Sequence, residues 1–176
     1  MDTKLLPASP ESIALAAALL KEGELVGLPT ETVYGLAADA LNPEAVRKIF
    51  AAKGRPQDNP LIVHICDLAM METLTSNPPK LAYKLAKAFW PGPMTMVLPK
   101  AAYLSDEVTA SLSTVGIRFP AHPAAQAIIR ESGLPLAAPS ANLSGSPSPT
   151  RASHPDYRRR RMRRRARIHR HCRHRG

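Results

Sequence analysis

Two cationic side chains flank a glycine in the stretch KGRPQDNPLIVHI, residues 53–65. Lys53 closes a predicted helix, and Arg55 follows the glycine in a predicted loop. An arginine fork and a lysine charge can together hold polyphosphate oxygens or a carboxylate. A solvated helix end with a stray arginine would give the same pattern, but residues 1–150 contain only four arginines. The stretch lacks the glycine spacing of a P-loop, which excludes nucleotide binding of that type.

Two further polar residues interrupt strands that are otherwise apolar. Arg118 stands in VGIRFP, and burying its guanidinium requires an acidic partner or an anionic ligand. The sequence leaves a structural salt bridge and a substrate carboxylate equally open. His64 stands near the end of PLIVHIC, where a packing residue and a ligand-binding residue are both compatible with the pattern. No His, Asp or Cys lies at metal-ligand spacing from it, so we predict no metal site.

Hydroxyl groups gather after two other predicted strands. Thr30 and Thr32 follow the strand LVGLP, where an open α/β sheet collects its ligands. The stretch APSANLSGSPS offers Ser140, Asn142 and Ser148 together with exposed backbone N–H groups, a combination suited to phosphate or ribose. Turns that satisfy their own backbone groups would use the same residue types, so neither stretch decides the function alone.

Strands and helices alternate along the first 150 residues, which predicts an α/β fold with a mixed sheet covered by helices. Ser9 and Asn42 are predicted caps, each followed by a proline in the first helical turn. The predicted helices are 9–23, 42–54, 67–74, 78–90 and 122–133, and the predicted strands are 25–29, 60–66, 94–99, 115–120 and 134–141.

The 176 residues suit one domain, and 44% of them are hydrophobic. No apolar run reaches the roughly 20 residues of a membrane span, and the N-terminus is a poor signal peptide. We therefore predict a cytoplasmic protein without membrane association. Cys66 and Cys172 lie in unlike contexts, which supports neither a disulfide framework nor a cysteine metal site.

The net charge of +10 belongs to the C-terminal tail. Residues 151–176 hold 12 of the 24 cationic residues, all of them arginine, whereas residues 1–150 carry 12 cations and 13 anions. The tail contains no lysine and no strand or helix periodicity. A natural basic arm that binds nucleic acid would have this composition. We favour translation of the wrong, GC-rich reading frame, which resequencing the gene would test.

Taken together and in order, these stretches resemble the YrdC/Sua5 family of threonylcarbamoyl-AMP synthases. The matching pieces are PTETVYGLAADA, KGRPQDNPLIVHI, WPGPMTMVLP, VGIRFPAHP and PLAAPSANLSGSPSPT. The resemblance implies an open twisted mixed sheet with a positively charged cleft. It also implies a nucleotidyltransferase that condenses L-threonine, bicarbonate and ATP, with Mg²⁺, to threonylcarbamoyl-AMP and pyrophosphate. A partner transferase then modifies adenosine 37 of tRNAs to give t6A.

The resemblance also implies roles for individual residues. Thr30, His64, Arg118 and Ala138 would surround the threonine, with Arg118 on its carboxylate. Lys53 and Arg55 would hold the ATP phosphates and act in catalysis, and the remaining nucleotide contacts would come from Thr114, Ser140, Asn142 and Ser148.

The resemblance stops after residue 154, which predicts a YrdC-like domain over 1–154 and a tail over 155–176 that is disordered or out of frame. The family's last strands and a further binding serine and arginine cannot be located there, so we expect an incomplete sheet and impaired activity. An alternative is a non-catalytic module that binds tRNA or rRNA through the cleft and the basic tail. A hydrogenase maturation protein is disfavoured because the chain lacks CxxC pairs.

Overall fold

The computed structural model describes residues 4–54, 56, 58–142 and 165–169. Lys4 and residues 165–169 are described by their backbone alone. The helices are α1 (Pro10–Lys21), α2 (Pro43–Lys53), α3 (Leu68–Leu74), α4 (Lys80–Phe89), α5 (Asp106–Thr109) and α6 (Pro123–Ser132). The strands are β1 (Lys4–Pro7), β2 (Leu25–Leu28), β3 (Gly35–Asp39), β4 (Ile62–His64), β5 (Thr95–Pro99), β6 (Thr114–Arg118), β7 (Leu136–Ala137) and β8 (Arg165–His169).

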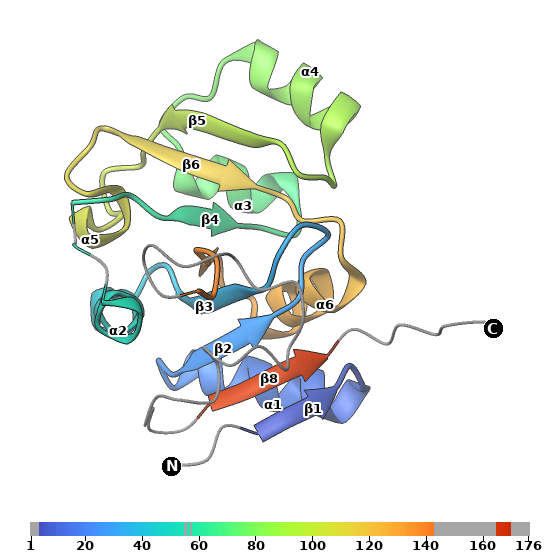
Figure 1. Ribbon diagram of the computed structural model, residues 1–176. Coiled ribbons are helices and arrows are strands. Elements are labelled where there is room, and N and C mark those ends of the chain that lie inside the picture. The colour runs from blue at the N-terminus through green and yellow to red at the C-terminus, as the bar shows by residue number, and fades with distance from the viewer. Residues whose placement is uncertain (1–3, 55, 57, 143–164, 170–176) are drawn as a thin grey trace.

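All eight strands form one mixed sheet in the order β1-β8-β2-β3-β7-β4-β6-β5, which Figure 1 shows from edge to edge. β1, β8 and β2 are parallel, as are β4 and β6, and the remaining neighbours are antiparallel. The predicted mixed α/β fold is confirmed. Among the described residues, no helix has the length and apolar character needed to cross a lipid bilayer.

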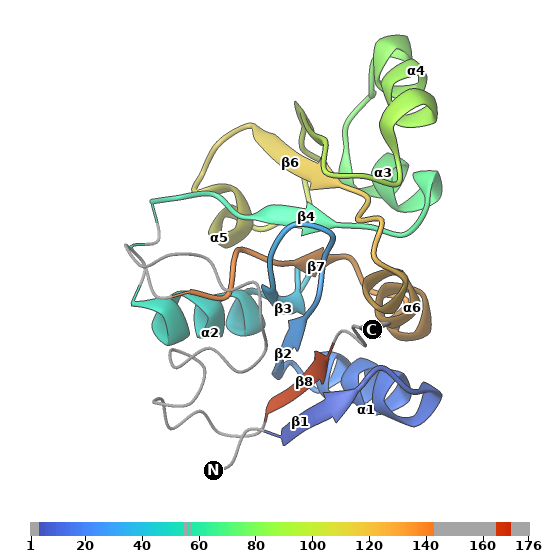
Figure 2. The same ribbon diagram turned by 45° about the vertical axis from the view of Figure 1, so that its right-hand side comes forward.

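The helices cover the sheet from two sides. α1 and α6 enclose one apolar cluster that includes Leu20, Val26 and Ile128, and they lie together in Figure 2. α2 through α5 contribute to a larger cluster on the other side, with Ile49 and Met71 among its fully buried side chains. The sheet between these clusters is therefore a rigid support for the loops at its rim.

Local signals in the sequence explain where the first two long helices begin. The Ser9 hydroxyl accepts a hydrogen bond from the backbone N–H of Ser12 at the start of α1. Asn42 likewise caps α2 by accepting from Glu44 and Ala45. Gly54 ends α2 in the left-handed conformation, with φ of 58°, which places Lys53 in its last turn.

Strand β8 corrects the prediction that the Arg-rich tail forms no strand. Arg165–His169 pairs in parallel with β2 on one side and with β1 on the other. The ladder is made of backbone groups, so the edge that β2 offers can take a strand of almost any composition. The expectation that nothing from the tail completes the sheet is therefore wrong. The division at residue 154 and the frame-error hypothesis stay predictions.

Candidate functional site

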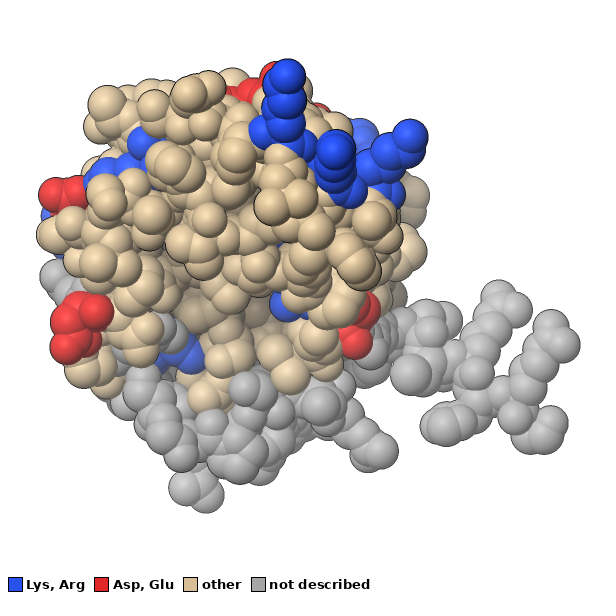
Figure 3. All heavy atoms as spheres, turned by 90° about the horizontal axis from the view of Figure 1, so that it is seen from above, with Lys and Arg blue, Asp and Glu red and all other residues tan. Residues whose placement is uncertain are grey.

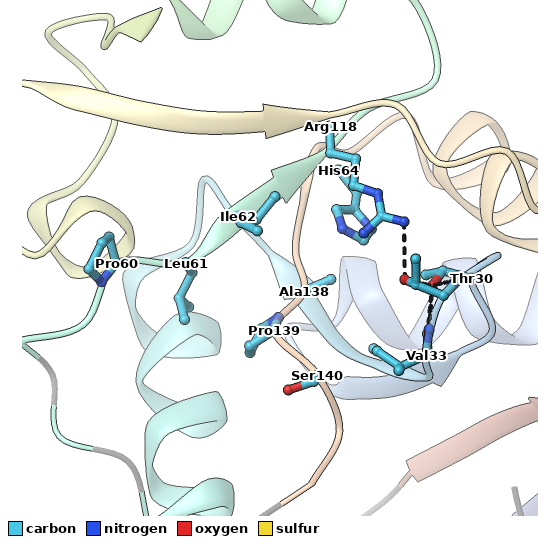
Figure 4. Close-up of a pocket in the computed structure, with 12 residues that line it drawn as sticks. Thr30, Val33, Pro60, Leu61, Ile62, His64, Arg118, Ala138, Pro139 and Ser140 are labelled. Carbon is cyan, nitrogen blue, oxygen red and sulfur yellow. Dashed lines mark hydrogen bonds between the residues drawn. The ribbon is translucent and has the colours of Figure 1, made fainter. Parts of the chain in front are cut away.

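A pocket of about 290 Å³ lies where the loops after β2 and β7 meet β4 and the end of β6 (Figure 4). Its walls are mostly apolar, and its polar side chains come from both threonines of the first loop, from the ends of two strands and from Ser140 in the loop after β7. The lining residues are Thr30, Thr32, Val33, Gly35, Pro60, Leu61, Ile62, His64, Arg118, Ala138, Pro139 and Ser140.

Strand register brings the histidine and the arginine together. In the parallel pair of β4 and β6, His64 lies opposite Arg118. The residues of β6 alternate between buried and half-buried, and Arg118 shares the half-buried face with Gly116 and Thr114. Figure 4 shows the side chains of His64 and Arg118 next to each other at one end of the pocket. Two residues far apart in the sequence therefore form one polar group.

Glu31 is the acidic partner of Arg118. Arg118 Nη2 donates to Glu31 Oε1 at 2.5 Å and to Thr32 Oγ1 at 3.1 Å. The guanidinium is nevertheless incompletely satisfied, because its buried Nε makes no hydrogen bond within the described part of the chain. Both interpretations of Arg118 thus stay compatible with the structure: a salt bridge is present, and the guanidinium keeps one donor that no described residue accepts.

The salt bridge sets the charge state of Glu31. Burial alone would raise its pKa, but hydrogen bonds from Arg118 and backbone N–H groups, together with the charge of Arg118, lower the pKa below its ordinary value. Glu31 is therefore a carboxylate at neutral pH.

His64 is neutral in this pocket. It is 3% exposed, and burial together with the nearby Arg118 charge lowers its pKa to about 3. Its Nδ1 is buried and has no hydrogen-bond partner among the described residues. A buried polar atom in that state favours a ligand or water that supplies the missing bond.

The Thr30 hydroxyl shapes the turn after β2. Its Oγ1 donates to the carbonyl of Val33 at 2.6 Å and accepts from the backbone N–H groups of Thr32 and Val33. Thr30 and Thr32 also share a hydrogen bond at 3.0 Å. The turn that the residue types predicted is therefore present, and it lines the pocket at the same time.

Lys53 reaches the loop after β7 from the end of α2. Its ammonium donates to the carbonyl of Ser140 and, at 2.5 Å, to the carbonyl of Asn142, and the residue is 4% exposed. Two carbonyl dipoles thus stabilise its charge. Ser140 itself lines the pocket, so Lys53 lies behind a wall of the pocket rather than on it.

The remaining predicted residues are distributed as follows. Ala138 lines the pocket. Thr114 does not line it; Thr114 begins β6 and pairs with Pro99 of β5. Arg55 and Ser148 lie outside the described residues. Glu31 is the site residue that the sequence reasoning missed, although it stands between the two threonines that were singled out.

Charge is sparse on the face shown in Figure 3. The view from above is mostly uncharged, with a few cationic atoms set back in its hollow and others protruding near one edge. Within the described ranges, no cluster of three His, Cys, Asp or Glu side chains could hold a metal ion. Arg118 is the cation among the described residues that line the pocket, and the walls around it are largely apolar.

Comparison with known proteins places this geometry in a family. The family model Sua5_yciO_yrdC, described as "Telomere recombination", matches residues 18–162. The chain belongs to this family. The match runs beyond residue 154, the point at which the resemblance was expected to stop.

Curated relatives carry the synthase name. Threonylcarbamoyl-AMP synthase of Bacillus subtilis (strain 168) is 61% identical over 153 residues, which are 86% of this chain and 44% of that protein. The synthase of Pyrococcus abyssi is 54% identical over 81% of this chain and 42% of that protein. The chain thus spans a little under half the length of these relatives.

The fold agrees with a solved member of the family. The crystal structure of P. abyssi Sua5 complexed with L-threonine superimposes with a TM-score of 0.86 at 45% identity, over 96% of this chain and 50% of that one.

Proposed function

We propose that this chain acts as the substrate-binding and catalytic part of a threonylcarbamoyl-AMP synthase. It condenses L-threonine, bicarbonate and ATP to threonylcarbamoyl-AMP, pyrophosphate and water. The identity of 61% to a protein of that name, over 86% of this chain, carries the proposal. The pocket adds support, because its cation, neutral histidine and hydroxyls suit a small amino acid.

Threonine would bind at the polar end of the pocket. Arg118 lines the pocket, and its guanidinium would pair with the carboxylate of threonine. His64, being neutral, would offer Nδ1 as a hydrogen-bond partner without adding charge. Thr30 and Ala138 would complete the contacts. The complex of P. abyssi Sua5 with L-threonine supports threonine as the ligand.

ATP would bind along the loop after β7. Ser140 lines the pocket and Asn142 follows it, while Lys53 holds both carbonyls of this loop. Arg55 would neutralise the phosphate oxygens, and Lys53 would add its positive charge from behind this loop. Thr114 and Ser148 would contact the nucleotide. Mg²⁺ would arrive as part of the MgATP substrate.

The reaction needs no covalent enzyme intermediate. The neutral amine of threonine attacks bicarbonate or CO₂ to form a carbamate, and water leaves when bicarbonate is the donor. A carbamate oxygen then attacks the α-phosphorus of ATP, and pyrophosphate leaves with the electron pair of the broken P–O bond. Positioning and neutralisation of charge would supply the catalysis.

The product would be consumed by a separate transferase acting on adenosine 37 of tRNAs in the cytoplasm. The Arg-rich tail could act here in one of two opposite ways: as a basic arm that binds tRNA, or as a defect that impairs activity. A salt titration of tRNA binding by the intact chain separates these two roles, because a basic arm loses affinity for tRNA steeply as the salt concentration rises.

Release of pyrophosphate by the purified chain tests the function. We expect release only when threonine, bicarbonate and MgATP are all present, and we expect Lys53→Ala and Arg55→Ala to lower it by orders of magnitude. Exchange of Lys48, whose ammonium binds Glu24 on the surface, for alanine is the matched control. Binding of tRNA without any threonine-dependent pyrophosphate release would favour the non-catalytic alternative.

A further inference from the structure

Glu31 joins the two loops that close the polar end of the pocket. Its Oε1 accepts from Arg118 Nη2 at 2.5 Å, and its Oε2 accepts from the backbone N–H of Ala121 at 3.1 Å. The side chain is only 22% exposed, against 11% for Arg118. The two carboxylate oxygens therefore make separate contacts, because one holds the guanidinium and the other ties Glu31 to the segment that follows β6.

Glu31 acts on the pocket from outside it. Arg118 and Thr32 line the pocket, whereas Glu31 does not. Glu31 and Thr32 both take hydrogen bonds from Nη2, while the buried Nε makes none among the described residues. The contact with Glu31 thus fixes the rotation of the guanidinium, whose Nε–H has no hydrogen-bond partner among the described residues.

We propose that Glu31 is a positioning residue that orients Arg118 for the carboxylate of the amino-acid substrate. The inference rests on the proposed function. An arginine fork binds a carboxylate with geometric specificity only when the plane of the guanidinium is held in advance. Without Glu31, the largely buried guanidinium of Arg118 would lose its ionic partner and turn toward other acceptors.

Glu31 also has an opposing effect, since its negative charge repels an incoming carboxylate. Its two oxygens already accept hydrogen bonds from Arg118 and Ala121, so much of that charge is compensated locally. Orientation is therefore expected to outweigh repulsion, and removal of Glu31 is expected to weaken binding of the carboxylate.

Calorimetry with two ligands separates positioning from general damage. L-Threonine and L-threoninamide share the ammonium group and the side chain, but only threonine has a carboxylate for Arg118. Removing an outer partner that orients a metal ligand typically costs about 10–100-fold in affinity, and we take the lower end of that range for the partner of an arginine. We expect Glu31→Ala to weaken threonine binding by about tenfold and threoninamide binding by less than about twofold.

Two variants sharpen the measurement. Glu31→Gln keeps one oxygen, which can serve Arg118 or Ala121 but not both, so its threonine affinity should fall between those of wild type and Glu31→Ala. Glu24→Ala is the matched control, because Glu24 is 23% exposed and pairs with Lys48 at 3.0 Å. Its affinity for either ligand should equal that of wild type.

Steady-state kinetics give a second readout. With Glu31→Ala, the KM for threonine should rise while the KM for ATP and the kcat at saturating threonine stay near wild type. Equal losses for threonine and threoninamide would reduce Glu31 to a structural residue and overturn the proposal. Unchanged or tighter threonine binding would overturn it as well. A wild-type chain that neither binds threonine nor releases pyrophosphate would instead refute the proposed function itself.

Discussion

Replacing His64 by glutamine is expected to flatten the dependence of stability on pH between pH 7 and pH 5. Burial and the charge of Arg118 lower the pKa of His64 from 6.5 to about 3. In the unfolded chain the imidazole takes up a proton as the pH falls through about 6.5, whereas in the folded chain it stays neutral down to about pH 3. The unfolded state binds more protons throughout this window, so acid destabilises the fold.

The size of the effect follows from the two pKa values. Each pH unit within the window changes the free energy of unfolding by about 1.4 kcal/mol, and the change is smaller near the unfolded pKa. Between pH 7 and pH 5, His64 should therefore lower the free energy of unfolding by about 2 kcal/mol. This figure depends mainly on the unfolded pKa, because at pH 5 the folded histidine is still almost wholly neutral.

Urea unfolding at pH 7 and at pH 5, in the absence of ligand, measures the difference. Between pH 7 and pH 5, the free energy of unfolding of the wild-type chain should fall by about 2 kcal/mol more than that of His64→Gln. A change in packing caused by the substitution affects both pH values equally, so it cancels in this comparison. His122→Asn is the control, since His122 caps α6 through its ring and asparagine is a favoured cap. Equal losses in wild type and His64→Gln would refute the neutral, buried histidine on which the pocket's electrostatics depend.

Four further substitutions test three separate features. Arg118→Lys keeps the charge but removes the fork, and calorimetry should show at least about tenfold weaker binding of L-threonine. Lys53→Met leaves two backbone carbonyls without their buried donor, and the free energy of unfolding in urea should fall by about 1–3 kcal/mol. Gly92→Ala would place a Cβ 2.5 Å from the carbonyl oxygen of Phe89, and this clash should lower the free energy of unfolding by about 1–3 kcal/mol. Gly133 has a φ of +68° but no atom within 4 Å of an added Cβ, so Gly133→Ala should lower the free energy of unfolding by only about 1 kcal/mol. Thermal unfolding of the two variants measures both effects. A larger loss of stability in Gly133→Ala than in Gly92→Ala would contradict the steric argument.

The sequence predicted those elements whose signals are local. The caps and first-turn prolines of α1 and α2 fix where these helices begin, and the structure confirms both. β3 was missed because GLAAD contains no β-branched or aromatic residue that favours a strand. It is a strand because β2 and β7 pair with it on both sides, which is a tertiary effect.

The site was predictable in its parts but not in its assembly. The need of Arg118 for an acidic partner or an anion follows from its apolar strand, yet the sequence could not choose Glu31 from among the 14 acidic residues of the chain. The proximity of His64 to Arg118 arises from the pairing of β4 with β6, which no spacing in the sequence encodes. The burial of Lys53 against the loop after β7 is likewise a product of tertiary packing.

The pairing of Lys4 with Ala166 has a consequence for synthesis on the ribosome. Translation adds roughly 5–20 residues per second, so β1 would leave the ribosome roughly 10–30 s before the segment that pairs with it. During that interval the backbone groups of β1 have no partner strand in the sheet, because β8 is its only neighbour among the described strands. A nascent chain stalled before residue 165 should therefore expose its first residues to proteases, and release of the remaining residues should protect them.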